Sequence, residues 1–165
     1  MELYLKPTTA EDYDVYYTIR CSPGDVYWNG YHSAPDKEKF QKLFLERLGD
    51  AKFEQPEDRR LFLIQIRTNE GDISVGFLQL IKREDGVDIG YSVIEAYQKC
   101  GYATEALKLG IQLAKKFDNT IYVQIRDDNM ASQRVALKCQ FIRTEEYTEH
   151  DYPIVGKVKL RKYKL

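Results

Sequence analysis

The chain has 165 residues, of which 43% are hydrophobic and 31% charged, and its formal net charge at pH 7 is −1. This length and balance are typical of one globular domain over residues 1–165, with enough apolar side chains for a core. The near-neutral charge argues against a nucleic-acid-binding protein, and no apolar run approaches the ~18 residues of a membrane-spanning helix. The first residues also lack the basic leader and apolar run of a signal peptide.

The three cysteines, Cys21, Cys100 and Cys139, lie far apart in the chain, and the two histidines stand apart from them. Neither a disulfide framework nor a metal site is therefore expected. A reducing compartment suits such cysteines, so we expect a cytoplasmic protein with no nucleic-acid partner and no membrane association.

The first part of the chain predicts one strand and two helices. Thr8 and Glu11 have the spacing of a capping box, which marks the start of a helix. Phe40, Leu43 and Phe44 fall on one face of a second helix. The expected elements, in chain order, are a strand over 3–5, a helix over 10–19, a loop over 21–33, a helix over 35–48 and a polar loop over 50–60.

The middle and the end of the chain predict most of a sheet. Three strands with short links, over 61–67, 73–82 and 87–94, form an antiparallel meander. The later expected elements are a helix over 104–117, a strand over 120–126, a helix over 129–139 capped by Asn129, and strands over 141–150 and 155–165. The helix over 104–117 makes its flanking strands parallel neighbours. The fold class is therefore α+β: one mixed, mostly antiparallel sheet flanked by helices.

The basic segment KVKLRKYK near the end of the chain alternates in polarity. It favours an amphipathic strand with Lys and Arg outward, which would protect a sheet edge from aggregation.

The stretch EAYQKCGYATEAL, residues 95–107, joins an expected strand to an expected helix. The first N–H groups of a helix lack intrahelical partners and carry partial positive charge. Gly101 permits a sharp turn, and Ala103 and Thr104 are too small to block an approaching phosphate, so the stretch predicts an anion-binding turn. The spacing also fits an ordinary turn, and neither a Walker loop nor a Rossmann fingerprint is complete. An unrelated phosphate-binding α/β protein is thus one alternative.

Two separated motifs, together spanning residues 87–141, resemble the GNAT N-acetyltransferase superfamily. Gln98-x-x-Gly101-x-Ala103 looks like its acyl-CoA loop, and Asn129-x-x-Ser132, followed by KCQF at 138–141, looks like a second family segment. The sequence of these motifs is most similar to that of the branch that includes ribosomal-protein alanine N-acetyltransferases. The resemblance implies a GNAT-like domain, acetyl-CoA as cofactor, and cofactor strands (87–94 and 121–126) that splay apart at one end.

The resemblance also implies a cofactor pose. The pantetheine would pair with the backbone of the first cofactor strand, and the pyrophosphate would rest on N–H groups of the loop before the helix. The residues expected to bind the cofactor are Ser92, Val93, Ile94, Gln98, Lys99, Cys100, Gly101, Tyr102, Ala103, Thr104, Asn129 and Ser132. Cys100 is expected to contribute only its backbone. Gln140 replaces the usual family glycine before Phe141, so the end of that helix is expected to differ.

The resemblance implies direct attack of an amine on the thioester in a ternary complex, with Ser132, Asn129 and Glu95 as catalytic candidates. The tyrosine that protonates the thiolate in many members is replaced by Ala136, whereas Ser132 matches a serine that contacts the sulfur in the most similar branch. Asn129 is expected to hydrogen-bond to the pantetheine or to a bound water, and the alternative is that it only caps the helix. Gln124 stands where some relatives carry a glutamate.

The general base stays open between Glu95 acting through water, a late glutamate and a water chain. The late glutamates are Glu145, Glu146 and Glu149. All of these carboxylates also fit plain solvation.

The expected acceptor is a primary amine, either a protein N-terminus or a small-molecule amine, bound by a monomer or homodimer. Freeing a lysine amine of its proton at pH 7 costs about 4.6 kcal/mol, against about 1 kcal/mol for an α-amine. Tyr27, Trp28 and Tyr31 lie where this fold lines its acceptor site, although core packing is the alternative. Asp25 and the late glutamates could attract a cationic amine, with plain solvation as the alternative. The alternative to an enzyme is a non-catalytic acyl-CoA-binding regulatory domain on the same fold.

Overall fold

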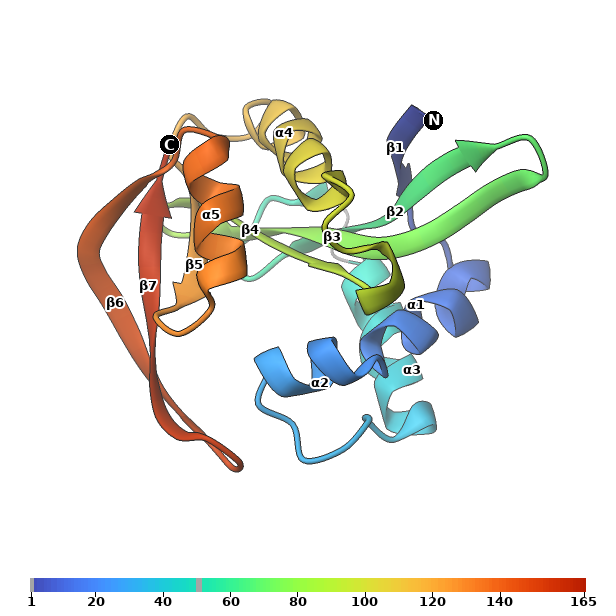
Figure 1. The fold of residues 1–165 in the computed structure, drawn as a ribbon, viewed down its shortest axis with the longest axis horizontal. Helices are drawn as coiled ribbons and strands as arrows, with labels where there is room; N and C mark the ends of the chain where they lie inside the picture. The colour runs from blue at the N-terminus through green and yellow to red at the C-terminus, as the bar shows by residue number, and fades with distance from the viewer. Residues whose placement is uncertain (1, 50–51) are drawn as a thin grey trace.

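In the computed structural model, which describes residues 2–49 and 52–165, a seven-stranded sheet runs through the molecule in the order β1-β2-β3-β4-β5-β7-β6 (Figure 1). Residues 50–51, the start of the loop expected over 50–60, lie outside the described ranges. The strands are β1 (Glu2–Pro7), β2 (Arg59–Thr68), β3 (Gly71–Arg83), β4 (Gly86–Val93), β5 (Ile121–Arg126), β6 (Ile142–Tyr152) and β7 (Gly156–Lys164). Only the β4–β5 pair is parallel, so the expected mixed, mostly antiparallel α+β fold is confirmed.

Helices cover both faces of the sheet (Figure 1). One face packs against α1 (Tyr13–Arg20), α2 (Pro23–Trp28) and α3 (Lys37–Gly49), and the other against α4 (Tyr102–Ala114) and α5 (Met130–Lys138). Two short 3₁₀ helices, Ala10–Asp12 and Glu95–Tyr97, precede α1 and α4. Because neighbouring strand residues point to opposite faces, Phe77 joins the core under α1 and α3, while Leu78 joins the core under α4. None of the helices in the described ranges has the length and apolarity needed to cross a membrane.

The loop expected over 21–33 is wrong in part, because α2 occupies Pro23–Trp28. Turn-forming residues suggested a loop, but Pro23 stands in the first helical turn, where its missing N–H is harmless, and Asp25 suits the positive helix start. The capping box is also displaced by one residue. Thr9, not Thr8, donates its N–H to Asp12 Oδ2 at 2.8 Å.

The basic segment near the end of the chain forms β7, but the expectation that it protects a sheet edge is wrong. β7 lies between β5 and β6, and the edges of the sheet are β1 and β6. Arg161 is buried there, with its guanidinium 2.9 Å from the Asp127 carboxylate. The ion pair replaces the hydration that an outward-facing arginine would have had.

α5 ends at Lys138, and Gln140 lies in the turn that follows it. Gln140 has a φ of 68°, in the left-handed region that a glycine adopts at little cost. A residue with a Cβ costs roughly 1–2 kcal/mol there. The turn that follows α5 therefore carries local backbone strain at Gln140.

The feature that positions the functional site is the short pairing between β4 and β5. These strands pair only at Val87↔Ile121 and Asp88↔Tyr122. Beyond those residues β4 continues beside β3 and β5 beside β7. The two parallel strands therefore separate at their C-terminal ends, as expected, and leave a gap in the middle of the sheet.

Candidate active site

A cavity of about 1350 Å³, here called the main cavity, opens at the β4–β5 gap and extends over the α1–α3 face of the sheet. One part of its wall comes from β4, the loop before α4 and the start of α5. The other part comes from α2 and the segment after it, α3, and the ends of β2 and β3. The wall residues that the sequence had singled out are Trp28, Tyr31, Ser92, Val93, Gln98, Lys99, Gly101, Tyr102, Ala103, Thr104, Asn129 and Ser132.

The loop before α4 is built as an anion cradle. Gly101 and Lys99 both have left-handed backbones, with φ of 86° and 62°. The first intrahelical bond of α4 runs from the Glu105 N–H to the Gly101 carbonyl at 3.1 Å, so the helix offers no acceptor to the N–H groups of Ala103 and Thr104. A Cβ on Gly101 would meet no atom within 4 Å, so the glycine serves the backbone conformation and the space beside it is open.

The backbone of β4 presents alternate residues to the gap. The Ile94 N–H donates to the Val75 carbonyl on β3 at 3.0 Å, whereas the Val87 N–H donates toward β5, to the Thr120 carbonyl at 2.9 Å. Since backbone groups alternate along a strand, Val93 faces the gap, and Ser92 and Ile94 face β3. The Gln98 side chain donates to the Val93 carbonyl at 2.9 Å and so ties the loop to the end of β4.

The start of α5 forms the opposite wall of the gap. Asn129 is the N-cap, because its Oδ1 accepts the Ser132 N–H at 3.1 Å. The Ser132 carbonyl accepts the Tyr91 hydroxyl at 3.5 Å, and burial raises the pKa of Tyr91 well above its ordinary value. Asn129 and Ser132 therefore sit together on the cavity wall, held from β4, with the positive end of the helix beside them.

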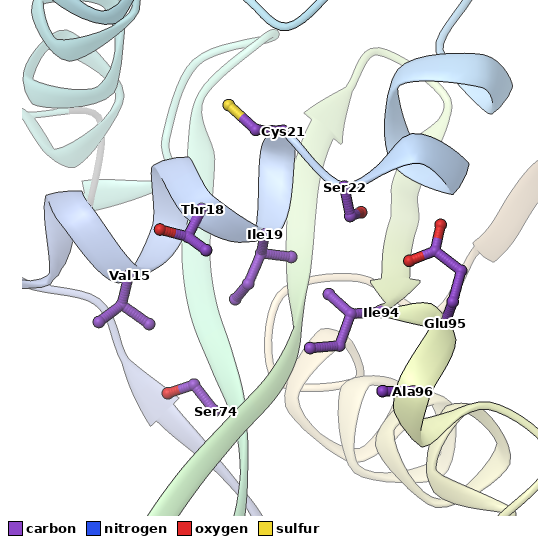
Figure 2. A pocket seen from close by; sticks show the side chains of 9 residues that line it. All are labelled: Val15, Thr18, Ile19, Cys21, Ser22, Ser74, Ile94, Glu95 and Ala96. Atoms are coloured by element: carbon purple, nitrogen blue, oxygen red, sulfur yellow. The ribbon is translucent and has the colours of Figure 1, made fainter.

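Four of the expected site residues lie off the main-cavity wall. Glu95 and Ile94 line a separate cavity of about 580 Å³ between α1 and the end of β4, and Figure 2 shows the Glu95 carboxylate directed toward Ser22. That carboxylate accepts the Gly24 N–H. Cys100 is exposed, and its thiol contacts the Gln98 carbonyl at 3.4 Å. Tyr27 is the fourth.

The aromatic residues of α2 make cation–π contacts with Arg126. The Arg126 guanidinium lies 5.1 Å from the Tyr27 ring centroid and 4.8 Å from that of Trp28. The same guanidinium pairs with Asp128 at 2.7 Å. Cation–π contact thereby fixes α2 against the end of β5, and Trp28 and Tyr31 face the main cavity.

The late glutamates lie off the main-cavity wall, and two of them take part in surface ion pairs. Glu146 pairs with Lys164 and Lys162, and Glu145 pairs with Arg143 at 3.2 Å. Glu149 is exposed on β6.

Asp25 is a buried carboxylate on the cavity wall, and it lies 3.2 Å from Arg20 Nε. The Arg20 guanidinium in turn lies 4.9 Å from the Phe77 ring centroid. Burial raises the pKa of the Asp25 carboxyl, against the charge of Arg20 and the neighbouring Ser92 and Asn29 side chains, which favour ionisation. Asp25 thus ties α2 to α1 through Arg20, which itself contacts Phe77 of β3.

A second buried carboxylate, Asp88, was not anticipated from the sequence. It lies where β4 and β5 still pair, accepts the Gln124 amide at 2.9 Å, and lies 3.4 Å from the Arg83 guanidinium. Burial raises its pKa above the ordinary value. The signal available in the sequence was an acidic residue within an apolar strand. A buried charge requires hydrogen-bonding or oppositely charged partners, so such a residue indicates a polar cluster inside the fold.

A family model of the acetyltransferase (GNAT) domain matches residues 2–142. This chain belongs to the GNAT acetyltransferase family. It is therefore an acyltransferase that uses acetyl-CoA, as the resemblance implied, and the alternative of an unrelated phosphate-binding protein is wrong.

Solved structures of GNAT enzymes share the fold at low sequence identity. Spermidine N-acetyltransferase from Vibrio cholerae, in complex with CoA and spermine, has a TM-score of 0.80 and 12% identity, covering 99% of this chain and 94% of that one. An acetyltransferase from Salmonella typhimurium that modifies the N-terminal serine of a 50S ribosomal subunit protein has a TM-score of 0.77 and 16% identity, with 99% and 94% covered. A putative ribosomal-protein-serine acetyltransferase from Vibrio cholerae has a TM-score of 0.72 and 20% identity, with 100% and 94% covered. No curated protein matches the sequence.

The anion cradle predicts a specific effect of Gly101→Ala. A Cβ at this φ costs roughly 1–2 kcal/mol, and relief of the strain would turn the loop N–H groups away from their common direction. We expect acetyl-CoA affinity, measured by calorimetry, to fall about tenfold, the equivalent of ~1.4 kcal/mol.

Gly156→Ala is the matched control, because Gly156 has a φ of 69°, open space around it, and a position in the β6–β7 turn. It should lose similar thermal stability and keep its acetyl-CoA affinity. Equal affinity in Gly101→Ala and the unsubstituted protein would contradict the cradle.

Proposed function

We propose that this GNAT domain, residues 1–165, transfers the acetyl group of acetyl-CoA to a primary amine by direct attack in a ternary complex. The observation that carries the proposal is the β4–β5 gap, which has an anion cradle at one end and the buried Asp25 carboxylate on the acceptor side. The acceptor is a protein N-terminus or a small amine. The fold neighbours named above include enzymes for both kinds of amine, which supports this range. The cytoplasm is the proposed location, consistent with three free cysteines.

The residues around the gap fit coenzyme A. N–H groups of the loop before α4 suit the pyrophosphate, and Lys99, Arg134 and Lys138 on the cavity wall supply positive charge for phosphate groups. The backbone of Val93 faces the gap and suits the amide groups of the pantetheine. Acetyl-CoA supplies a thioester carbonyl as the electrophile.

Two side chains assist the reaction in this proposal, one at the attacking amine and one at the departing thiolate. Asp25 draws a cationic amine toward the gap and takes the proton that the amine must lose, since its raised pKa makes it a better base than an exposed carboxylate. The Ser132 hydroxyl donates a hydrogen bond to the departing thiolate, in the first turn of α5, where the helix end also favours negative charge. Asn129 holds this turn in place as its cap.

The direct test is release of free thiol from acetyl-CoA in the presence of peptide N-termini, polyamines and amino sugars, with the acetylated product identified by mass. We expect amine-dependent release, and we expect Ser132→Ala to lower kcat by about 10²-fold while acetyl-CoA affinity changes little. Val135→Ala, another truncation on α5 beside the same cavity, is the control for packing. Binding of acetyl-CoA without any amine-dependent release would favour the non-catalytic regulatory alternative, and unchanged kcat in Ser132→Ala would remove its hydroxyl from the mechanism.

The raised pKa of Asp25 predicts the pH dependence of the rate. The carboxylate form is the base, so kcat/KM should fall as pH drops through the raised pKa of Asp25. That limb should stay in place when a lysine-type acceptor replaces an α-amine, although the pKa values of the two amines differ by about 2.5 units. Asp25→Asn should lose the limb and about 10² in kcat/KM.

Glu95→Gln is the matched carboxylate-to-amide change outside the main cavity. It should lose less activity than Asp25→Asn. The reverse order would assign the base to Glu95. Because Asp25→Asn leaves Arg20 buried without its partner, circular dichroism should verify that each variant is folded at the assay temperature.

A further inference from the structure

We infer that the acceptor carries an anionic group, a carboxylate or a phosphate, about 13 Å from the amine that is acetylated. This inference rests on the proposed function and names the substrate class of the same site. Its basis is a group of three residues on the wall of the main cavity, Arg47, Arg59 and Arg83, here called the arginine cluster.

The strand register fixes where the arginine cluster lies relative to the gap. Arg59 pairs with Ile81 and Ile81 with Asp88, so these residues form one row across β2, β3 and β4. Ser92, beside the gap, lies on the same face four residues along β4 from Asp88. At ~3.3 Å per residue the two rows are about 13 Å apart. Because α3 packs over β2, Arg47 reaches the same end of the cavity.

Gly90 lies between these two ends on β4, and the Gln79 side chain packs closely over it. A Cβ at Gly90 would lie 3.0 Å from Gln79 Nε2. Any larger residue there would thus push the Gln79 side chain into the cavity between Asp88 and Ser92. Asp88, Gly90 and Ser92 all line the main cavity, so the same cavity extends from the gap to the arginine cluster.

The charge on the cavity wall is strongly positive. Among the described residues that line it, eight are Arg or Lys and three are Asp, whereas the whole chain has a net charge of −1. Most of the paired cations lie outside the cluster or at its edge: Arg20 with Asp25, Arg126 with Asp128, and Arg83 with Glu57 and Asp88. Among the described residues, the wall cations without an ion pair divide between the two ends of the cavity. Lys99, Arg134 and Lys138 lie beside the gap, where the cofactor phosphates are proposed to bind, whereas Arg47 and Arg59 lie at the opposite end.

The arginine cluster has more donors than the chain supplies acceptors. Arg59 donates to the neutral Gln79 Oε1 at 2.9 Å, and neither it nor Arg47 takes part in an ion pair within the described ranges. The buried Nε of Arg83 has no hydrogen-bond partner. Burial and the like charges of Arg47 and Arg83 lower the pKa of Arg59, and the opposing charge of Glu57 does not offset them. Guanidinium groups in this arrangement suit the planar oxygens of a carboxylate or a phosphate.

A peptide and a small molecule can both present this chemistry, and the test separates them. An extended peptide spans ~3.3–3.6 Å per residue, so an acidic side chain on its fourth residue reaches the arginine cluster from an acetylated N-terminus. The first arm compares C-terminally amidated pentapeptides that differ only in Asp, Asn or Lys at the fourth position. The second arm compares a linear ω-amino acid, the corresponding amino alkyl phosphate and a diamine of equal length.

The first readout is kcat/KM, and the second is the fluorescence of Trp28, the single tryptophan of the chain and a residue of the cavity wall, titrated with each acceptor in the presence of CoA. We expect the anionic member to be preferred at least tenfold over the cationic one in the arm that matches the natural acceptor. Arg47→Gln should cut that preference about tenfold, and Arg47→Glu should reverse it. Lys42→Gln removes a charge from an exposed position on the same helix and should leave the preference unchanged.

The outcomes separate the inference from the proposed function. Acetylation of all members without a charge preference overturns the inference and keeps the proposed function. Tighter binding of the anionic member by Trp28 fluorescence, without turnover of any amine, keeps the inference and overturns acetyl transfer to amines. Equal binding, no binding, or a preference for the lysine peptide and the diamine overturns the inference.

Discussion

The site depends on how little β4 and β5 pair. Two residue pairs join these parallel strands at their start, and each then follows a different antiparallel neighbour. A parallel pair that continued would consume the backbone groups of Val93 in a sheet ladder. Because the ladder stops at Asp88, that backbone is left facing a gap, with the start of α4 on one side of it and the start of α5 on the other. The cofactor site that we propose is thus a stretch where the sheet is interrupted.

Two kinds of electrostatic construction share the main cavity. The cradle before α4 uses backbone N–H groups held by left-handed residues, which cost some strain but cannot be titrated. The acceptor side uses side chains: Asp25 lies beside Arg20 and Asp88 beside Arg83, and burial raises the pKa of both carboxyls. Phe77 contacts the Arg20 guanidinium and the α2 aromatics contact the Arg126 guanidinium, so these two positive charges are fixed in position. In the account proposed here, such a cavity selects its ligands by charge at both ends.

The sequence was sufficient where local pattern decides structure. Alternation predicted β5 with Ile121, Val123 and Ile125 on one side, where they join the core under α4, and Gly101 predicted the sharp turn before α4. It was insufficient where distant segments meet. The helix α2 depends on the ion pair between Arg20 and Asp25 and on the contact of Arg126 with its aromatic rings. The turn-forming residues in this segment predicted a loop and gave no sign of these contacts. Likewise the three residues of the arginine cluster come from α3, β2 and β3, and their spacing in the sequence does not indicate that they line the same cavity wall.

The central claim, that the strand gap and the loop before α4 hold the cofactor, is tested most directly by amide chemical shifts. In a ¹⁵N-labelled sample titrated with CoA, the account predicts the largest shifts at Val93, residues 99–104, Asn129 and Ser132, with the β2–β3 hairpin turn around Gly71 unaffected. Gly71 lies at the far end of that hairpin and is absent from the cavity wall among the described residues. Saturable binding with shifts concentrated away from residues 93–104 and 129–132 would contradict the account.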